Sequence, residues 1–353
     1  MKIFPPQKYE HDLRQIFKKK RGCLYPNCTA KVILSHTLQK SGCLSLIAED
    51  NHVYQYQITM NILDNLLENH LPSPTKIGIN NASTFFGFCN CHDTQLFHEI
   101  ENCPLVPTTS QINRISFRSL CSELYRKISS AESKSVMKAV ELQAKKINEN
   151  PELVEILQET NKIIEEGVKM GVSILLSAYD RFLSYLQDES TWHLDFLLLK
   201  LTEIPEVLCS SYFSPEIDFE NNSLQILARE KEASQGVFLN IFVNNGIGYI
   251  LFSWEKSHKK MEAFVYSLVT QNDIINTTIA LMFSYIENHV FNISWWNNLS
   301  IIRKKDIFQR VMDMYHLQGF KAPKKYASWN FSAKTSSLQI IKKLKERGIT
   351  MFE

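Results

Sequence analysis

The chain has 353 residues and a mass of 41.0 kDa, which is long enough for two or three domains that bury a core. Hydrophobic residues make up 44% of it and charged residues only 22%, a balance that excludes a disordered or linker-rich protein. No apolar run reaches the length of a membrane span, and the first six residues lack the apolar segment of a secretion signal. We therefore expect a cytoplasmic protein with no membrane partner.

The formal net charge of +2 hides an uneven distribution of charged residues. Residues 1–105 carry 10 Lys and Arg against 9 Asp and Glu, residues 106–300 carry 17 against 24, and residues 301–353 carry 12 against 4. The basic C-terminal tail is either a solvated helix face or a surface that contacts phosphates. The same two interpretations apply to the run of four cations from Lys18 to Arg21.

The first region that the apolar pattern predicts is residues 1–105. It contains an amphipathic helix near residues 10–18 and two strands near 31–36 and 52–57. Two further helical segments are expected near 44–49 and 93–97. Pro104 and Pro107 end this unit.

Residues 106–204 are predicted to be helical. Apolar residues recur with a period near 3.6 from residue 117 to 147 and again from 151 to about 186, with a break at Asn148-Glu149-Asn150-Pro151. This pattern predicts an antiparallel helix pair. Its apolar face would suit a homodimer, although a pair buried in the core would give the same pattern.

Residues 205–353 are predicted to form a small antiparallel sheet with helices. Strands are expected at 207–213, 224–228, 237–243 and 248–254, and helices at 258–270, 273–288 and 301–317. The sequence Asn244-Asn245-Gly246 is a hairpin turn signal between the last two strands. We expect Trp295 and Trp296 to fill the core. The fold class that results is α+β.

The eight cysteines favour metal binding and core packing over disulfides, because no secretion signal accompanies them. Cys23 and Cys28 flank a turn at Pro26-Asn27, which would let both sulfurs face one point. The other four cysteines that lie apart from this site are expected to act as small core residues: Cys43, Cys103, Cys121 and Cys209.

A second pair of candidate ligands lies at the start of the helix near residue 93. Cys89 and His92 are three residues apart, so both would project from one face of a helix. Together with Cys23 and Cys28 they supply the four ligands that tetrahedral Zn²⁺ prefers. Cys91 lies between them and would serve in place of either one.

A zinc unit with a histidine at the end of the strand after the first cysteine pair resembles the zinc-stapled HNH nuclease family, over about residues 20–100. The resemblance implies a treble-clef, ββα-metal-like unit in which a strand-end histidine activates water for attack on a phosphodiester. It assigns His36 as the general base and Asp93, directly after His92, as a ligand of catalytic Mg²⁺ or Mn²⁺.

The sequence departs from that family pattern at three points. Ser35 stands where the family usually has Asp or His before the base, and serine is a weaker metal ligand. The second pair is not a clean Cys-x2-Cys-His, and the middle Asn of the pattern is not assigned, since Asn80 and Asn81 both fit by position and neither by spacing. A histidine that bonds a backbone carbonyl, or that binds zinc itself, would also explain His36.

Four segments spread over most of the chain resemble an uncharacterised bacterial protein family. They are Ser35-His36-Thr37-Leu38-Gln39-Lys40, Ala82-Ser83-Thr84-Phe85, Gly87-Phe88-Cys89 with His92-Asp93, and Glu287-Asn288 with Trp295-Trp296. This resemblance implies a bacterial cytosolic protein whose zinc unit is joined to the helical and sheet-bearing regions. It brings no assigned activity with it.

Two functions are therefore expected. The first is a metal-dependent nuclease whose basic segments hold nucleic acid; by analogy, such an activity would suit defence against phage or a toxin-like role. The second is a non-catalytic module in which zinc staples a small unit that binds nucleic acid or another protein. No nucleophile-elbow pattern supports a hydrolase of the Ser/His or Cys/His type.

Overall fold

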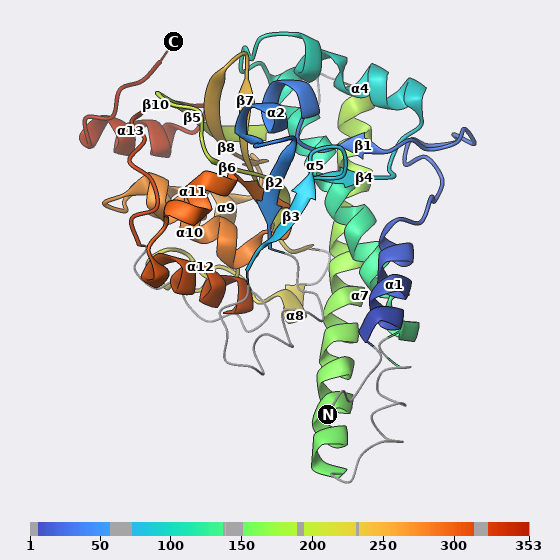
Figure 1. Ribbon diagram of the computed structural model, residues 1–353. Helices are drawn as coiled ribbons and strands as arrows, with labels where there is room; N and C mark the ends of the chain where they lie inside the picture. Colours follow the sequence, from blue (N-terminus) through green and yellow to red (C-terminus); the bar gives the residue numbers. More distant parts are fainter. Residues whose placement is uncertain are drawn as a thin grey trace.

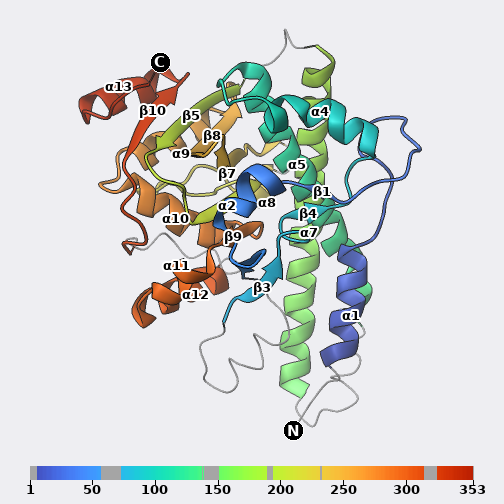
Figure 2. The same cartoon turned by 45° about the horizontal axis from the view of Figure 1, so that its top comes forward.

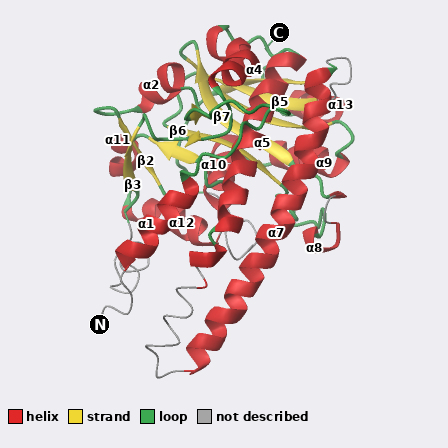
Figure 3. Ribbon diagram, turned by 90° about the vertical axis from the view of Figure 1, so that its right-hand side faces the viewer, coloured by secondary structure: helices red, strands yellow, loops and turns green. Residues whose placement is uncertain are grey.

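The computed structural model of the chain has an α+β fold, as the sequence predicts, in which helices cover both faces of one large sheet (Figures 1 and 3). The structure describes residues 6–56, 73–136, 138, 151–188, 194–230, 233–313 and 324–352. The predicted helix ends near residues 147 and 317 lie outside these residues. In the part of the chain so described, no helix is long and apolar enough to cross a membrane.

The central sheet has eight strands in the order β10-β5-β8-β7-β6-β9-β2-β3, and every neighbouring pair in it is antiparallel. The strands are β2 (His52–Gln55), β3 (Thr75–Gly78), β5 (Leu194–Leu201), β6 (Val207–Phe213), β7 (Val237–Asn244), β8 (Ile247–Glu255), β9 (His289–Phe291) and β10 (Phe331–Thr335). A second sheet has only two strands, β1 (Ser35–His36) and β4 (Thr84–Phe85).

Helices form the two outer layers. On one face of the sheet lie α5 (Thr109–Glu132) and α7 (Pro151–Gln187), which pack against each other, with α1 (Pro6–Phe17) beside α5 (Figure 2). The helices associated with the other face are α9 (Lys259–Val269), α10 (Ile274–Tyr285), α11 (Ile293–Asn298) and α12 (Ile301–Asp313). The remaining helical elements are η1 (Lys40–Leu44), α2 (Ser45–Ile47), α4 (Asn90–Asn102), α8 (Leu227–Glu230) and α13 (Leu338–Glu346).

The sheet is apolar on both faces. Side chains alternate between the faces of a strand, so a strand that is covered on both sides needs a continuous apolar run. In β5, Leu197 and Leu199 join the core that contains α9 and α10, whereas Leu198 joins the core that contains α5 and α7. All three leucines are fully buried, and the sheet therefore separates two hydrophobic cores.

The hairpin of β7 and β8 confirms the sequence prediction in detail. Asn245 and Gly246 both have positive φ, 49° and 74°, as a two-residue type I′ turn requires. The predicted strand at 224–228 is wrong, because residues 227–230 form α8 and residues 224–226 lie outside any strand. The predicted helical region is also too long, since β5 begins at Leu194.

Two of the predicted domain boundaries are crossed by the central sheet. β2 and β3 come from residues 1–105, and β5 comes from residues 106–204, yet all three pair into the sheet that β6 to β10 complete. Tyr56, which follows β2, contacts Phe291 and Trp296 at ring-centroid distances of 6.1 and 5.5 Å. The larger core thus contains residues from both ends of the chain, including both predicted core tryptophans.

The basic C-terminal segment folds onto the sheet. α13 packs against α9 and buries Ile340 and Leu344, while β10 forms the edge of the sheet next to β5. Arg310 is buried and donates to Asp306 Oδ2 at 3.1 Å. Several cations of residues 324–352 are nevertheless exposed, which both interpretations of the basic tail allow: Lys324, Lys325, Lys342 and Lys345.

We expect residues 1–105 expressed alone to form no stable unit, even with Zn²⁺ added. The fragment would lose β9, the partner of β2, and the aromatic contacts of Tyr56. Circular dichroism should show no cooperative unfolding transition in the fragment, with the full chain as the control. A cooperative transition in the isolated fragment would contradict this expectation.

A second expectation concerns His289, which is 1% exposed. Burial lowers its pKa to about 4, against a hydrogen bond to the Ile286 carbonyl that raises it, and the charge of Arg126 lowers it further. The unfolded chain takes up this proton near pH 6.5. The stability from neutral His289 is therefore complete above pH 6.5 and is lost as the pH falls toward 4, by on the order of 3 kcal/mol.

The variant His289→Asn removes this titration and keeps a donor for the Ile286 carbonyl. Its free energy of unfolding in urea should depend less steeply on pH between 6.5 and 4 than that of the wild type. His98→Asn, at an exposed position on α4, serves as the matched control. An equal pH dependence in wild type and His289→Asn would refute the assignment.

Candidate metal centre

The first cysteine pair lies on a tight turn before β1. Asn27 has a φ of 58°, and Cys28 N donates to the Tyr25 carbonyl at 3.3 Å, so the chain reverses at Pro26-Asn27 as predicted. The loop is joined to the segment before α4 by two backbone hydrogen bonds, from Leu24 N to Gly87 O and from Ile33 N to Phe88 O, both 2.8 Å. These bonds bring the two cysteine segments together.

The second pair lies at the N-terminus of α4. Cys89 is the N-cap residue, and its sulfur accepts from the backbone N–H of His92. Gly87, two residues earlier, is held in a space where a Cβ would lie 2.1 Å from the Phe85 ring. A glycine at this position is therefore required for the close approach of the chain to Phe85 before α4 begins.

The four predicted ligands converge. The Sγ atoms of Cys23, Cys28 and Cys89 and a ring nitrogen of His92 all lie within 4.8 Å of one another. The Cys28 and Cys89 sulfurs are 3.8 Å apart, and His92 Nδ1 lies 3.5 Å from Cys23 Sγ and 3.4 Å from Cys89 Sγ. Ligands at tetrahedral zinc distances of about 2.0–2.3 Å are separated from one another by roughly 3.5–3.8 Å. Three of the six separations thus match those of a Cys₃His tetrahedron, and the others are at most 4.8 Å.

The position of Cys91 resolves the alternative that the sequence leaves open. Its side chain is exposed, and it is not part of the converging group, although it lies between two members of that group. All eight cysteines are free thiols. Cys43, Cys121 and Cys209 are buried, as predicted for core residues, whereas Cys103 is half-buried.

The surroundings of the four residues shift the pKa values of two of the thiols in opposite directions. A hydrogen bond from the His92 backbone lowers the pKa of Cys89, more than burial raises it, as expected for a sulfur at a helix N-terminus. Burial raises the pKa of Cys23 to about 11. A cation would be needed to hold Cys23 as a thiolate at neutral pH, and the four residues could hold one.

Aromatic side chains fix the group from outside. The Tyr25 ring stacks on the His92 ring at a centroid distance of 4.0 Å, and the Tyr179 hydroxyl of α7 donates to the Leu24 carbonyl. The Tyr125 hydroxyl of α5 lies 2.9 Å from the Lys19 carbonyl oxygen and 3.0 Å from that of Phe17, so its one proton reaches either of them. The loop that carries Cys23 is therefore held by both helices of the α5–α7 pair.

His36 lies on β1, where it faces Thr84 of β4 in the antiparallel pair. Its Nε2 lies 2.9 Å from the Ile79 carbonyl oxygen. A carbonyl only accepts, so this contact assigns the proton to Nε2 and leaves Nδ1 as an acceptor in the neutral ring. Burial lowers the pKa of the half-buried His36, which favours that neutral form.

Asp93 lies in the first turn of α4, directly after His92, and is half-buried. Burial raises its pKa, against smaller lowering effects from Ser35, Arg118 and His36. The two candidate catalytic residues are thus close enough for the charge of His36 to act on Asp93. Oδ1 of Asp93 and the hydroxyl of Ser35 are both buried. The two side chains lie close enough for a hydrogen bond from Ser35 to lower the pKa of Asp93, and neither atom has a further partner within the described residues.

Two charged residues beside this pair were not singled out from the sequence. Arg118 of α5 is 4% exposed and donates to Glu101 Oε1 of α4 at 2.7 Å, and both charges act on His36 and Asp93. The ion pair forms between two helices whose packing is set by the tertiary fold. No local pattern in the sequence indicates it.

The run of cations near the first cysteine pair is partly used within the fold. Lys19 Nζ and Arg21 Nε donate to the Glu132 carboxylate at 2.9 and 3.0 Å, and the Lys20 ammonium lies 5.3 Å from the centre of the Phe86 ring. The two bonds to Glu132 attach the chain after α1 to the end of α5, and the Lys20 contact attaches it to the segment before α4. They support a structural role for Lys19 and Arg21.

No family model, curated protein or solved structure matches the chain.

Proposed function

We propose that Cys23, Cys28, Cys89 and His92 bind one structural Zn²⁺. The tetrahedral spacing of the four ligand atoms supports this proposal, as does the lowered pKa of Cys89. Hydrogen bonds between the sulfur atoms alone would leave the thiols packed against one another. A bound ion would instead be coordinated by all four ligand atoms. In this role the zinc would join the loop before β1 to the start of α4.

We further propose that the zinc-stapled unit is an HNH-like nuclease that cleaves phosphodiesters of nucleic acid. The order of its elements, the β1–β4 pair followed by α4, agrees with the ββα-metal unit that the resemblance implies. The observation that carries the proposal is that His36 lies near enough to Asp93, beside the cysteine group, for its charge to act on that carboxylate. Within the described residues, one nitrogen of the His36 ring is left without a hydrogen bond, and Asp93 has a buried carboxylate oxygen close to the Ser35 hydroxyl.

In this function His36 would act as the general base. Its Nδ1 would take a proton from the attacking water, while the Nε2–H bond to the Ile79 carbonyl would hold the ring and stabilise the imidazolium that forms. Asp93 Oδ1 would hold Mg²⁺ or Mn²⁺, which suit oxygen ligands. The ion would supply charge neutralisation at the phosphate in the transition state.

The alternative function is a zinc-stapled module that binds nucleic acid or another protein without catalysis. Ser35 favours it, because its buried hydroxyl stands where the nuclease pattern has a stronger metal ligand. The bonds from Lys19 and Arg21 to Glu132 favour it as well. They connect the chain before the cysteine loop to α5, which is a structural role that needs no catalysis. Defence against phage and dimerisation through the helical region stay predictions from the sequence.

Metal analysis tests the zinc site. The purified wild type should contain about one Zn²⁺ per chain, and Cys28→Ser should lose most of it because one tetrahedral ligand is weakened. Cys91→Ser is the matched control and should retain the metal, since its side chain lies outside the group. A folded wild type without zinc would overturn the assignment.

Cleavage assays test the catalytic proposal. Plasmid DNA and RNA are incubated with the protein in Mg²⁺ or Mn²⁺, and His36→Ala should lower the cleavage rate at least 100-fold, as expected on removal of a general base. Asp93→Asn should lower it by a similar factor through loss of the charged ligand. His98→Ala and Asp180→Asn, both at exposed positions, are the controls and should cleave at the wild-type rate.

Zinc content is measured for every variant, so that loss of cleavage is separated from loss of the fold. Cleavage that is absent from the zinc-loaded wild type, or unchanged in both zinc-loaded catalytic variants, would reject the nuclease. Retained binding of DNA or RNA in that case would support the non-catalytic module.

A further inference from the structure

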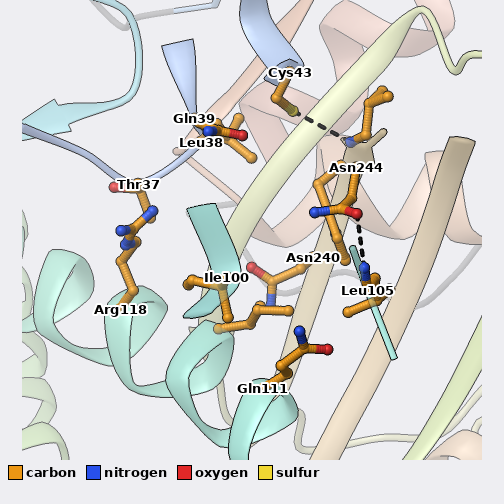
Figure 4. A pocket seen from close by; sticks show the side chains of 13 residues that line it. Thr37, Leu38, Gln39, Cys43, Ile100, Leu105, Gln111, Arg118, Asn240 and Asn244 are labelled. Carbon is orange, nitrogen blue, oxygen red and sulfur yellow. Dashed lines mark hydrogen bonds between the residues drawn. The ribbon is translucent and has the colours of Figure 1, made fainter. Parts of the chain in front are cut away.

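A small cavity lies between α5, β7 and the segment that follows β1 (Figure 4). Its volume is about 50 Å³. Residues from the segment after β1, from η1, from α4 and β7, and from the N-terminal half of α5 line it. Among them are the apolar side chains of Leu38, Ile100, Ile115 and Phe242. The cavity is separate from the cysteine group, none of whose members lines it.

Most polar side chains on the cavity wall bond to the protein itself. Thr37 Oγ1 donates to Ser122, and Gln39 Nε2 donates to the Glu101 carbonyl at 2.9 Å. The side-chain amide of Gln111 accepts from Val106 N, and that of Asn244 accepts from Leu105 N. Each amide also donates to a backbone carbonyl. These groups therefore have little capacity left for a ligand.

Two donors on the wall are different. Arg118 Nε and Asn240 Nδ2 make no hydrogen bond within the part of the chain that the structure describes, although the residues are only 4% and 2% exposed. The Asn240 amide is oriented by Ser119, whose hydroxyl donates to Oδ1 at 2.8 Å, so that Nδ2 is the end left over. A buried donor without a partner costs about 1–3 kcal/mol.

Arg118 of α5 and Asn240 of β7, which carry the two open donors, both line this cavity (Figure 4). Both are N–H groups, so they select a ligand that presents acceptors. The guanidinium of Arg118 uses another nitrogen for Glu101, which leaves Nε for a second acceptor, and a carboxylate oxygen forms the stronger hydrogen bond with such a donor. At about 10–15 Å³ for each water-sized group, the cavity holds roughly four such groups.

From these observations we propose that the cavity is a binding site for a small carboxylate, with one oxygen for Arg118 Nε and the other for Asn240 Nδ2. A carboxylate with a methyl group has four non-hydrogen atoms, and the apolar side chains of the wall suit its carbon end. The site uses neither His36 nor Asp93 as a binding group, although Arg118 also lies near that pair.

Acetate and acetamide are the probes, since they have nearly the same shape but differ in charge and in acceptors. Binding to the full-length protein is followed by ligand-observed NMR titration in a buffer without other carboxylates. Saturable binding of acetate, at least tenfold tighter than that of acetamide, is the expected result. No saturable binding of acetate, or equal binding of both probes, would mean that the cavity holds water only and would overturn the proposal.

Two variants locate the binding. Asn240→Asp replaces the open donor by a carboxylate and should weaken acetate binding at least tenfold, and Arg118→Lys, which keeps the charge but removes Nε, should also weaken it. Asn102→Asp, at an exposed position on α4, is the matched control and should bind as the wild type does. Cooperative thermal unfolding identifies the variants that fold; unchanged acetate affinity in either folded cavity variant would overturn the proposal.

Discussion

A row of hydroxyl groups along one face of α5 bonds this helix to the central sheet, and the rest of the structure is arranged around that contact. Ser116 lies 2.8 Å from Ser253 of β8, and Ser119 lies 2.8 Å from both Ser210 of β6 and Asn240 of β7. Ser122 accepts from Thr37 at 3.1 Å. The spacing of three residues keeps these side chains on one face, and their small size lets the helix approach the sheet closely. The other sides of α5 are left for α7, α1 and α4.

The sequence predicts the elements whose pattern is local. The β7–β8 hairpin is marked by Asn245-Gly246, and β6 is marked by its run of strand-forming residues at the predicted bounds of 207–213. β5 was missed because Leu194–Leu201 is buried on both faces and lacks alternation, so its leucines look like a continuation of the helix before it. The pairing of β2 with β9 joins residues more than 200 positions apart, and no local signal indicates such a contact.

The candidate site was predictable to the extent that it depends on spacing. Residue types and intervals were sufficient to select Cys23, Cys28, Cys89 and His92, but only the direction of the Cys91 side chain excluded that residue from the group. Arg118 was not predictable, since its importance comes from burial beside Glu101 and from the packing of α5 on α4. The cavity next to it arises from three distant segments that meet only in the folded chain.

The tyrosine hydroxyls that hold the cysteine loop have a thermodynamic consequence. Tyr125 and Tyr179 belong to the α5–α7 pair, and both bond to backbone carbonyls of residues 17–24. The free energy with which the cysteine group binds an ion includes the cost of ordering this loop. Linkage between two sites is reciprocal. If the helix pair strengthens the binding of an ion by a given free energy, the bound ion stabilises the helix pair by the same free energy. A ligand that moves α7 would therefore change the affinity of the metal centre without touching any of its four residues.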